Sequence, residues 1–277
     1  MYIDHAHFQP NSPMHGLALW GAYFMMNNQL ELAVVAMVLA LNFKQMALYF
    51  ALPFAFFALA KIWNRKQKSS LAAKLAYTGS QIAWLGIVFV MATCIVWLPW
   101  VMESIKDPRG AHGVPSILQR IFPVKRGLFQ AHLASFWSVA SNFYDVNNKL
   151  TQPQQIGAAL ILTVAASLPS CVALLRQPTN RNFILSLFSV SLAFYLFSFH
   201  VHEKQILCPT LFFGLAFPSL HSLFTPFILT AMFNLLELVQ REKNETTFII
   251  LQIFGALFLG TMQSFALNNF RTSSTKT

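Results

Sequence analysis

The chain has 277 residues, of which 56% are hydrophobic, 14% aromatic and 10% charged, and its net charge is +10. Soluble domains average about 25% charged residues, so the composition excludes an ordinary soluble enzyme or binding domain and indicates an integral membrane protein. Positive charge is typical of the cytoplasmic loops of membrane proteins, and we expect no nucleic-acid partner. Cys94, Cys171 and Cys208 lie in apolar stretches, so we expect them to be small buried hydrophobic residues.

Apolar stretches of helical length follow one another along the chain. In chain order they are Pro13–Met26, Leu30–Leu41, Met46–Leu59, Ile82–Met102, Ile156–Leu175, Phe183–Phe199, Ile206–Leu220, Leu223–Val239 and Phe248–Leu267. Ile82–Met102 and Ile156–Leu175 carry no charge and are long enough to cross about 30 Å of hydrocarbon. Pro13–Met26, Leu30–Leu41 and Ile206–Leu220 are short or interrupted, and we expect them to be tilted, kinked or re-entrant. The sequence predicts an all-α, polytopic transmembrane protein in which residues 1–277 form one multi-pass domain.

Basic residues predict the orientation of these helices in the membrane. Five of them, with no acidic residue, lie between Leu59 and Ile82: Lys61, Arg65, Lys66, Lys68 and Lys74. Positively charged loops stay in the cytoplasm, so we place this loop there. Counting one crossing per stretch then places Arg176 and Arg181 in the cytoplasm as well, and the long loop of residues 103–155 on the other, non-cytoplasmic side.

Three short polar segments interrupt this hydrophobic chain. We call them the first island (Asp4–Gln9), the second island (Phe122–Phe129) and the third island (His200–Lys204). Charged and imidazole groups at a membrane boundary cost free energy, so such residues usually have a function. The count of crossings places all three islands on the non-cytoplasmic side. The sequence therefore predicts a polar site built on a hydrophobic scaffold.

The first island combines a carboxylate, two imidazoles and an amide within a few residues. Asp4, His5, His7 and Gln9 together have enough donors and acceptors to hydrogen-bond a sugar or a phosphate. Their position near the start of the chain is equally compatible with a disordered segment.

The third island contains His200, His202, Glu203 and Lys204. These side chains suit a phosphate clamp, an acid–base pair or a metal site, and a structural pair of opposite charges is an alternative. A His-x-His pair lacks the third protein ligand that a catalytic zinc site needs. Among the functional interpretations we therefore favour anion binding and expect no metal.

The second island lies between two apolar patterns with helical spacing. These are Leu118, Ile121 and Phe122 before Pro123, and Phe129, Leu133, Phe136 and Trp137 after it. They predict two short amphipathic helices in the membrane interface. Lys125 and Arg126 lie at the junction beside Gly127, where a guanidinium and a close backbone approach suit the phosphate of a lipid head group. The alternative is a pair of interfacial helices with snorkelling basic side chains.

Four sequence blocks, in this order, resemble one family of membrane enzymes. They are Ile3–Asn11, Phe43–Tyr49, Arg120–Phe129 with Phe136 and Trp137, and His200–Lys204. The family is that of the dolichyl-phosphate-glucose-dependent alpha-1,3-glucosyltransferases of the endoplasmic reticulum, which extend the lipid-linked oligosaccharide used in N-glycosylation. Within it, Lys44–Met46 and Arg126–Phe129 are more similar to the enzyme that adds the first glucose than to the enzyme that adds the second.

The resemblance implies a GT-C glycosyltransferase fold in the endoplasmic reticulum membrane, and no cofactor. It implies an inverting hexosyltransferase that moves glucose from dolichyl phosphate glucose to a mannose of the dolichyl-diphosphate oligosaccharide. The candidate substrate-binding residues are those of the islands: Asp4, His5, His7, Gln9, Lys125, Arg126, His200, His202, Glu203 and Lys204.

The catalytic residue is not among these candidates. The resemblance places a carboxylate general base in a first lumenal loop, and this chain begins at the second lumenal segment of the family. We therefore expect a truncated sequence, or a product without glucosyltransferase activity of its own. The alternative is a non-catalytic membrane protein that retains the lipid-binding half of the fold.

The predicted orientation can be tested by labelling in a chain without its native cysteines. A cysteine introduced near Lys68 should react with an impermeant maleimide once the plasma membrane alone is permeabilised. A cysteine near Gly113 should react only after the endoplasmic reticulum membrane is opened as well. Labelling of both positions from the cytosol would contradict the assignment.

Overall fold

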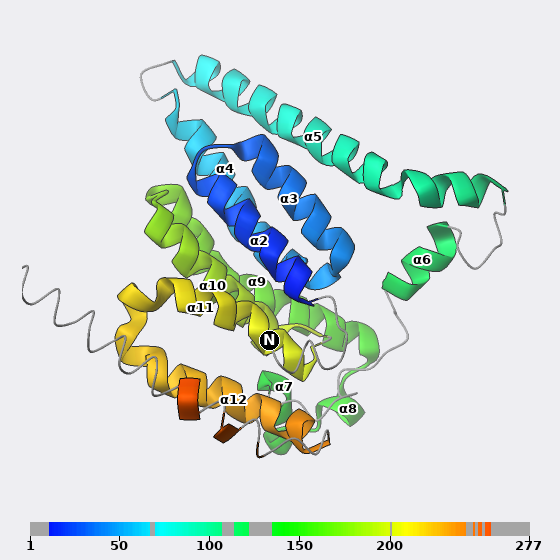
Figure 1. Ribbon diagram of the computed structural model, residues 1–277, viewed down its shortest axis with the longest axis vertical. Helices are drawn as coiled ribbons and strands as arrows, with labels where there is room; N and C mark the ends of the chain where they lie inside the picture. Colours follow the sequence, from blue (N-terminus) through cyan, green and yellow to red (C-terminus); the bar gives the residue numbers. More distant parts are fainter. Residues whose placement is uncertain are drawn as a thin grey trace, which may run out of the picture. The chain divides into compact units, whose positions relative to one another are not determined.

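A computed structural model gives the structure of most of the chain. It describes residues 11–66, 70–106, 114–121, 135–199, 201–241, 246, 249–250 and 253–255. All regular secondary structure within these residues is helical, which confirms the predicted all-α class (Figure 1). The chain packs as two units, Met1–Ala231 and Met232–Thr277. That residues 1–277 form one membrane domain stays a prediction.

The first unit contains the helices that matter for the site. They are α2 (Asn11–Met26), α3 (Leu30–Phe43), the 3₁₀ helix η1 (Gln45–Phe50), α4 (Ala51–Asn64), α5 (Leu71–Lys106), α6 (Val114–Ile121), α7 (Phe136–Phe143), α8 (Val146–Lys149), α9 (Gln152–Arg176), α10 (Asn180–Phe197), the 3₁₀ helix η2 (Glu203–Ile206), α11 (Leu207–Leu220) and η3 (His221–Leu223). Helix α12 (Phe224–Arg241) begins in the first unit and continues into the second.

Four helical segments within the described residues are long and apolar enough to cross a membrane: Gln45–Asn64, Leu71–Lys106, Gln152–Arg176 and Asn180–Phe197. The predicted spans Ile82–Met102 and Ile156–Leu175 lie inside two of them. The three shorter stretches form α2, α3 and α11. The predicted span Phe248–Leu267 lies mostly outside the described residues.

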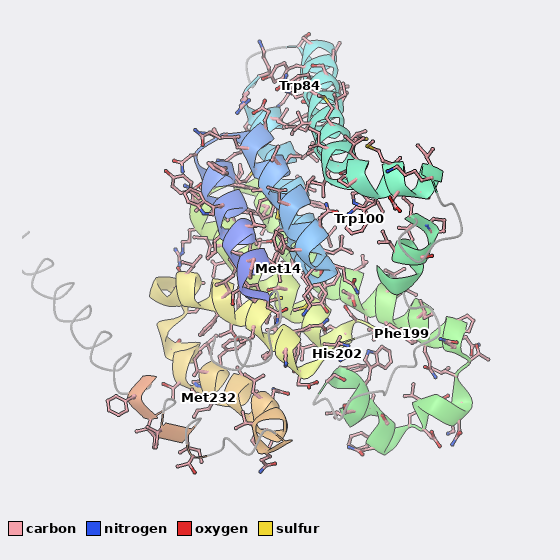
Figure 2. All side chains as sticks on the ribbon, turned by 45° about the vertical axis from the view of Figure 1, so that its right-hand side comes forward. Met14, Trp84, Trp100, Phe199, His202 and Met232 are labelled. Carbon is pink, nitrogen blue, oxygen red and sulfur yellow. The ribbon has the colours of Figure 1, made fainter. Side chains whose placement is uncertain are left out.

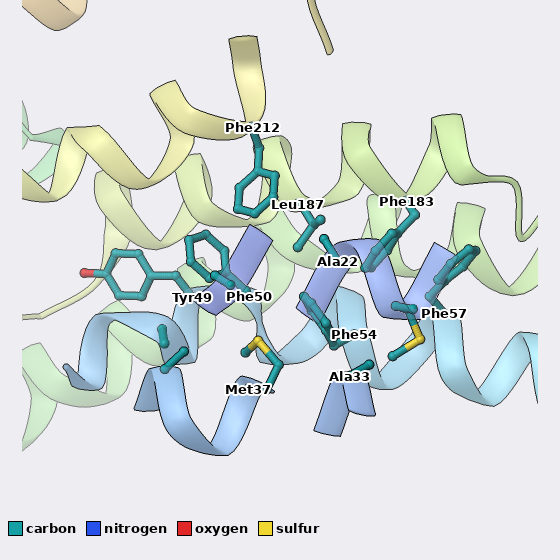
Figure 3. Packing of buried hydrophobic residues seen from close by; sticks show 14 of the residues in the cluster. Ala22, Ala33, Met37, Tyr49, Phe50, Phe54, Phe57, Phe183, Leu187 and Phe212 are labelled. Atoms are coloured by element: carbon teal, nitrogen blue, oxygen red, sulfur yellow. The ribbon is translucent and has the colours of Figure 1, made fainter. Parts of the chain in front are cut away.

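A column of aromatic rings along η1 and α4 forms the centre of the first unit (Figure 3). Phe50, Phe54 and Phe57 recur at i, i+4 and i+7, so they share one helix face. Phe57 stacks on Phe183 of α10 with ring centroids 4.3 Å apart, and Phe50 meets Phe212 of α11 edge-on at 4.8 Å. These contacts fix α4 against α10 and η1 against α11.

Small residues bring α2 and α3 close to this column. Ala18 and Ala22 of α2 and Ala33 and Ala40 of α3 are all buried. Gly21 lies close to the core, because an added Cβ would be 3.3 Å from the Phe54 ring, a tight contact to which the ring would have to yield. In a membrane, where lipid is as apolar as the side chains, small residues of this kind allow close helix packing.

Four basic residues of the first unit, Lys61, Arg65, Arg176 and Arg181, lie at one end, which we call the basic end. Lys61 Nζ donates to the carbonyls of Met25 and Met26, 2.9 and 3.1 Å away, at the close of α2. Arg181 Nε donates to Ser219 Oγ at 2.9 Å and so joins the start of α10 to the close of α11. This grouping agrees with the count of crossings, while the side of the membrane that it faces stays a prediction.

Helix α5 lies at the edge of the first unit, alongside α3 (Figures 1 and 2). Trp84 Nε1 donates to Glu31 Oε1 at 3.3 Å, and Trp97 Nε1 donates to Asn42 Oδ1 at 2.6 Å. With 36 residues α5 is about 54 Å long, more than a bilayer core requires. Cys94 on this helix is exposed, so its predicted burial is wrong, while Cys171 and Cys208 are buried as expected. A lipid-facing helix is apolar all round, so apolar neighbours do not imply burial.

The amphipathic helices of the central loop differ in part from the prediction. Helix α6 covers Leu118 and Ile121 as expected. Phe136 and Trp137, however, begin helix α7 instead of ending the predicted one. Ser135 has an extended backbone, with φ −110° and ψ 171°, and its side chain caps α7 together with Ser138. A continuous helix from Phe129 to Trp137 is therefore excluded, because an N-cap is not helical.

Removing an aromatic ring from the central column should destabilise the first unit. We expect Phe183→Ala to lower the free energy of unfolding by about 3–5 kcal/mol, because it leaves a cavity between α4 and α10. Phe89→Ala on the exposed side of α5 is the matched control and should cost much less. Thermal unfolding in one detergent compares the two, and equal losses would contradict the assigned core.

Candidate functional site

The third island lies at the end of the first unit opposite the basic end, and we call this the site end. Its last two residues begin η2, a single 3₁₀ turn capped by His202. The His202 side chain is exposed, Glu203 is half-buried, and Lys204 is only 7% exposed. His200 lies outside the described residues. The structure therefore presents an imidazole to the surface (His202 is labelled in Figure 2) and buries a lysine two residues later.

Gln205, which follows the third island, closes this turn from both sides. The His202 backbone N–H donates to Gln205 Oε1 at 2.9 Å, and the Gln205 backbone N–H donates to the His202 carbonyl at 2.9 Å. A side chain that satisfies the amide of the N-cap residue in this way completes a capping box.

The block Phe43–Tyr49 meets the third island through one side chain. Tyr49 of η1 donates its hydroxyl to the same Gln205 Oε1 at 2.9 Å, across 156 residues of sequence. The Tyr49 ring also packs on Phe194 of α10, with ring centroids 5.0 Å apart. Both Tyr49 and Gln205 are buried, so the interaction is shielded from water.

The block Phe43–Tyr49 also contacts the first residue of α2. Lys44 Nζ donates to Asn11 Oδ1, and Asn11 is fully buried. Asn11 is the last residue of the block that contains the first island. Asp4, His5, His7 and Gln9 themselves lie outside the described residues. One turn into α2, His15 Nε2 lies 3.5 Å from the buried Cys208 Sγ of α11.

The central loop also reaches the site end. Trp137 of α7 is 5% exposed and donates its indole N–H to the Phe197 carbonyl, 2.9 Å away at the close of α10. Phe136 packs on the Phe197 ring with centroids 5.2 Å apart. Lys125 and Arg126 lie outside the described residues. Each of the four sequence blocks thus has at least one described residue at the site end or next to it.

Two lysines of the site end lie in poorly hydrated places. Lys44 is half-buried and Lys204 is buried, and Glu203 shares the turn with Lys204. A buried ammonium is unfavourable unless hydrogen-bonded or paired, and Lys44 meets this need by donating to Asn11 Oδ1. Among the described residues no three His, Cys, Asp or Glu side chains come together as a metal site would require. The ammonium and imidazole groups at this end can donate hydrogen bonds to an anion.

Sequence reasoning missed several residues that build this end. Tyr49, Gln205, Lys44 and Asn11 were not candidates, although three of them lie in the family blocks. The available signal was the polar Lys44–Gln45 pair inside an otherwise apolar region. This pair indicated that residues 43–49 were of interest, but it did not predict which residue Tyr49 would bond to.

Comparison with known proteins gives the family. The ALG6, ALG8 glycosyltransferase family matches residues 1–277. Three relatives, each described as a "Dolichyl pyrophosphate Man9GlcNAc2 alpha-1,3-glucosyltransferase" or a probable one, are similar to most of the chain. The Gallus gallus protein is 35% identical over 87% of this chain and 45% of its own length. The Pongo abelii protein is 32% identical over 96% and 49%, and the Dictyostelium discoideum protein is 33% identical over 99% and 50%.

The chain thus spans about half the length of the curated relatives that it matches. The match extends over the whole sequence, including the four blocks that meet at or adjoin the site end. The chain belongs to the ALG6, ALG8 glycosyltransferase family.

Proposed function

We propose that this chain carries the lipid-phosphate-binding part of an alpha-1,3-glucosyltransferase of N-glycan assembly. The donor is dolichyl phosphate glucose, the acceptor is a mannose of a dolichyl-diphosphate oligosaccharide, and the enzyme lies in the endoplasmic reticulum membrane. The names of the relatives, which give the acceptor as dolichyl pyrophosphate Man9GlcNAc2 and the transfer as alpha-1,3-glucosyl, support the reaction.

One structural observation carries the proposal for this chain. Segments that are far apart in the sequence meet at the site end, through Tyr49 with Gln205, Lys44 with Asn11, and Trp137 with the Phe197 carbonyl. Helix packing alone does not require polar side chains at one end. An enzyme that takes a sugar from a lipid phosphate needs such a set of polar groups beside the membrane.

The site residues have distinct roles in this proposal. Lys204 and Arg126 bind the phosphate of the donor and stabilise the negative charge that grows on dolichyl phosphate as it leaves. His202 and Glu203 hydrogen-bond the sugar or the phosphate, as do the polar residues of the first island. A carboxylate general base removes the proton from the acceptor hydroxyl. That base is not assigned to any residue of this chain.

The orientation follows from the same proposal. The site end faces the lumen, where the family transfers glucose, and the basic end faces the cytoplasm. The cluster Lys61, Arg65, Arg176 and Arg181 at the basic end supports this, because positive loops remain in the cytoplasm.

The proposed reaction can be tested in cells that lack the first glucosyltransferase and accumulate unglucosylated lipid-linked oligosaccharide. The chain is expressed both as it stands and together with any open reading frame that precedes Met1 in its gene. We expect at least one of the two expressed forms to produce glucosylated oligosaccharide. Chromatography of the released glycans measures it. Full-level expression of both forms without glucosylation would favour the non-catalytic alternative.

Substitution of Arg126 tests the phosphate contact in whichever form is active. Arg126→Ala should lose a charge-assisted hydrogen bond of roughly 1.5–3 kcal/mol, and with it about ten- to a hundredfold in donor-dependent rate. Arg126→Lys should recover only part of the rate, because an ammonium group lacks the planar fork of a guanidinium. Full activity of Arg126→Ala, measured at limiting donor, would reduce Arg126 to an anchor in the membrane interface.

A further inference from the structure

One oxygen atom joins two distant parts of the site end. Gln205 Oε1 accepts hydrogen bonds from the Tyr49 hydroxyl and from the His202 backbone N–H, each 2.9 Å long. A carbonyl oxygen has two lone pairs, so both are used. The first donor belongs to η1, and the second belongs to the residue that caps η2.

The turn that carries Lys204 has little internal support. It is four residues long, and a 3₁₀ turn of this length has few backbone hydrogen bonds of its own. The Gln205 side chain supplies the additional bond to the His202 N–H. The terminal amide of glutamine rotates easily, because its last torsion has broad minima. A second donor is therefore needed to hold the oxygen in place, and Tyr49 supplies it.

Tyr49 is itself held firmly. In a 3₁₀ helix side chains three residues apart lie above one another, so Met46 with Tyr49 and Ala47 with Phe50 form two neighbouring rows. All four residues of these rows are buried, while Leu48 between them is exposed. The Phe50 ring meets Phe212 in the central core. The position of the Tyr49 hydroxyl therefore follows from the packing of the core.

We infer that Tyr49 and Gln205 are positioning residues, which hold the His202–Lys204 segment in the conformation that binds the lipid phosphate. The inference rests on the proposed function. Tyr49 acts through Gln205, and Gln205 acts on the His202 amide. Neither side chain has to touch the substrate. If the turn loosens, the fraction of molecules with Lys204 correctly placed falls, and the apparent affinity falls by the same factor.

The experiment uses the full chain in nanodiscs, with farnesyl phosphate as the probe and farnesol as the control without phosphate. Tyr49→Phe and Gln205→Leu each remove one polar group and retain the shape of the side chain. Each should speed hydrogen exchange of the His202 amide and weaken the binding of farnesyl phosphate, roughly two- to tenfold, the range of one neutral hydrogen bond. In the double variant Tyr49→Phe should add nothing at the His202 amide, because its effect passes through Gln205.

Ser219→Ala is the matched control. It removes the hydroxyl that accepts from Arg181 Nε at 2.9 Å, a bond of the same length at the basic end. It should change neither His202 exchange nor phosphate binding. Thermal unfolding of all variants identifies any general loss of stability, and a change confined to that measurement would show that the Tyr49–Gln205 bond is only structural.

The remaining outcomes separate the inference from the proposed function. Unchanged His202 exchange in both single variants would overturn the inference, whatever the affinity. Faster exchange with unchanged binding would also overturn it and leave the proposed function intact, since the unaltered chain still binds the phosphate. Failure of the unaltered chain to bind farnesyl phosphate more tightly than farnesol would remove the proposed phosphate site, and the inference with it.

Discussion

Aromatic packing along η1 and α4 determines where the polar groups of the first unit lie. The Phe57–Phe183 stack fixes α4 against α10, and the Phe50–Phe212 contact fixes η1 against α11. Because η1 continues directly into α4, these rings also place Tyr49 beside η2. A shift of α4 along its axis would separate the Tyr49 hydroxyl from Gln205. The geometry of the site end is therefore a consequence of the apolar core.

The bilayer explains why the polar contacts of Lys44, Lys61, Arg181 and Gln205 lie at helix ends. Inside hydrocarbon each backbone group must be satisfied within its own helix, and apolar side chains gain nothing by leaving lipid. Small residues such as Ala18, Ala22 and Gly21 then allow close packing, and aromatic rings fill the space between helices. Longer polar side chains find partners where helices end. Family residues from different helices consequently meet at one boundary.

Lysine has different uses at the two ends of the first unit. At the basic end Lys61 satisfies the last carbonyls of α2 and lies over the Phe57 ring, with Nζ 4.6 Å from its centroid. This is a structural role, since cations stabilise the C-terminal ends of helices. Lys204 instead lies in the single turn of η2, two residues after its cap residue His202. In the proposed function Lys204 binds the donor phosphate, so the same residue type would serve packing at one end and binding at the other.

The sequence by itself determined the membrane class, the helices around Ile82–Met102 and Ile156–Leu175, and the third island as a candidate site. These features depend on local composition and length, which the surrounding structure does not change. Only the tertiary structure decided that Cys94 is exposed, that α7 begins at Phe136, and that Tyr49 bonds to Gln205. The exposure of Cys94 depends on which helix lies at the edge of the first unit. The start of α7 depends on the residue that caps it. A hydrogen bond across 156 residues depends on the packing of every helix between them.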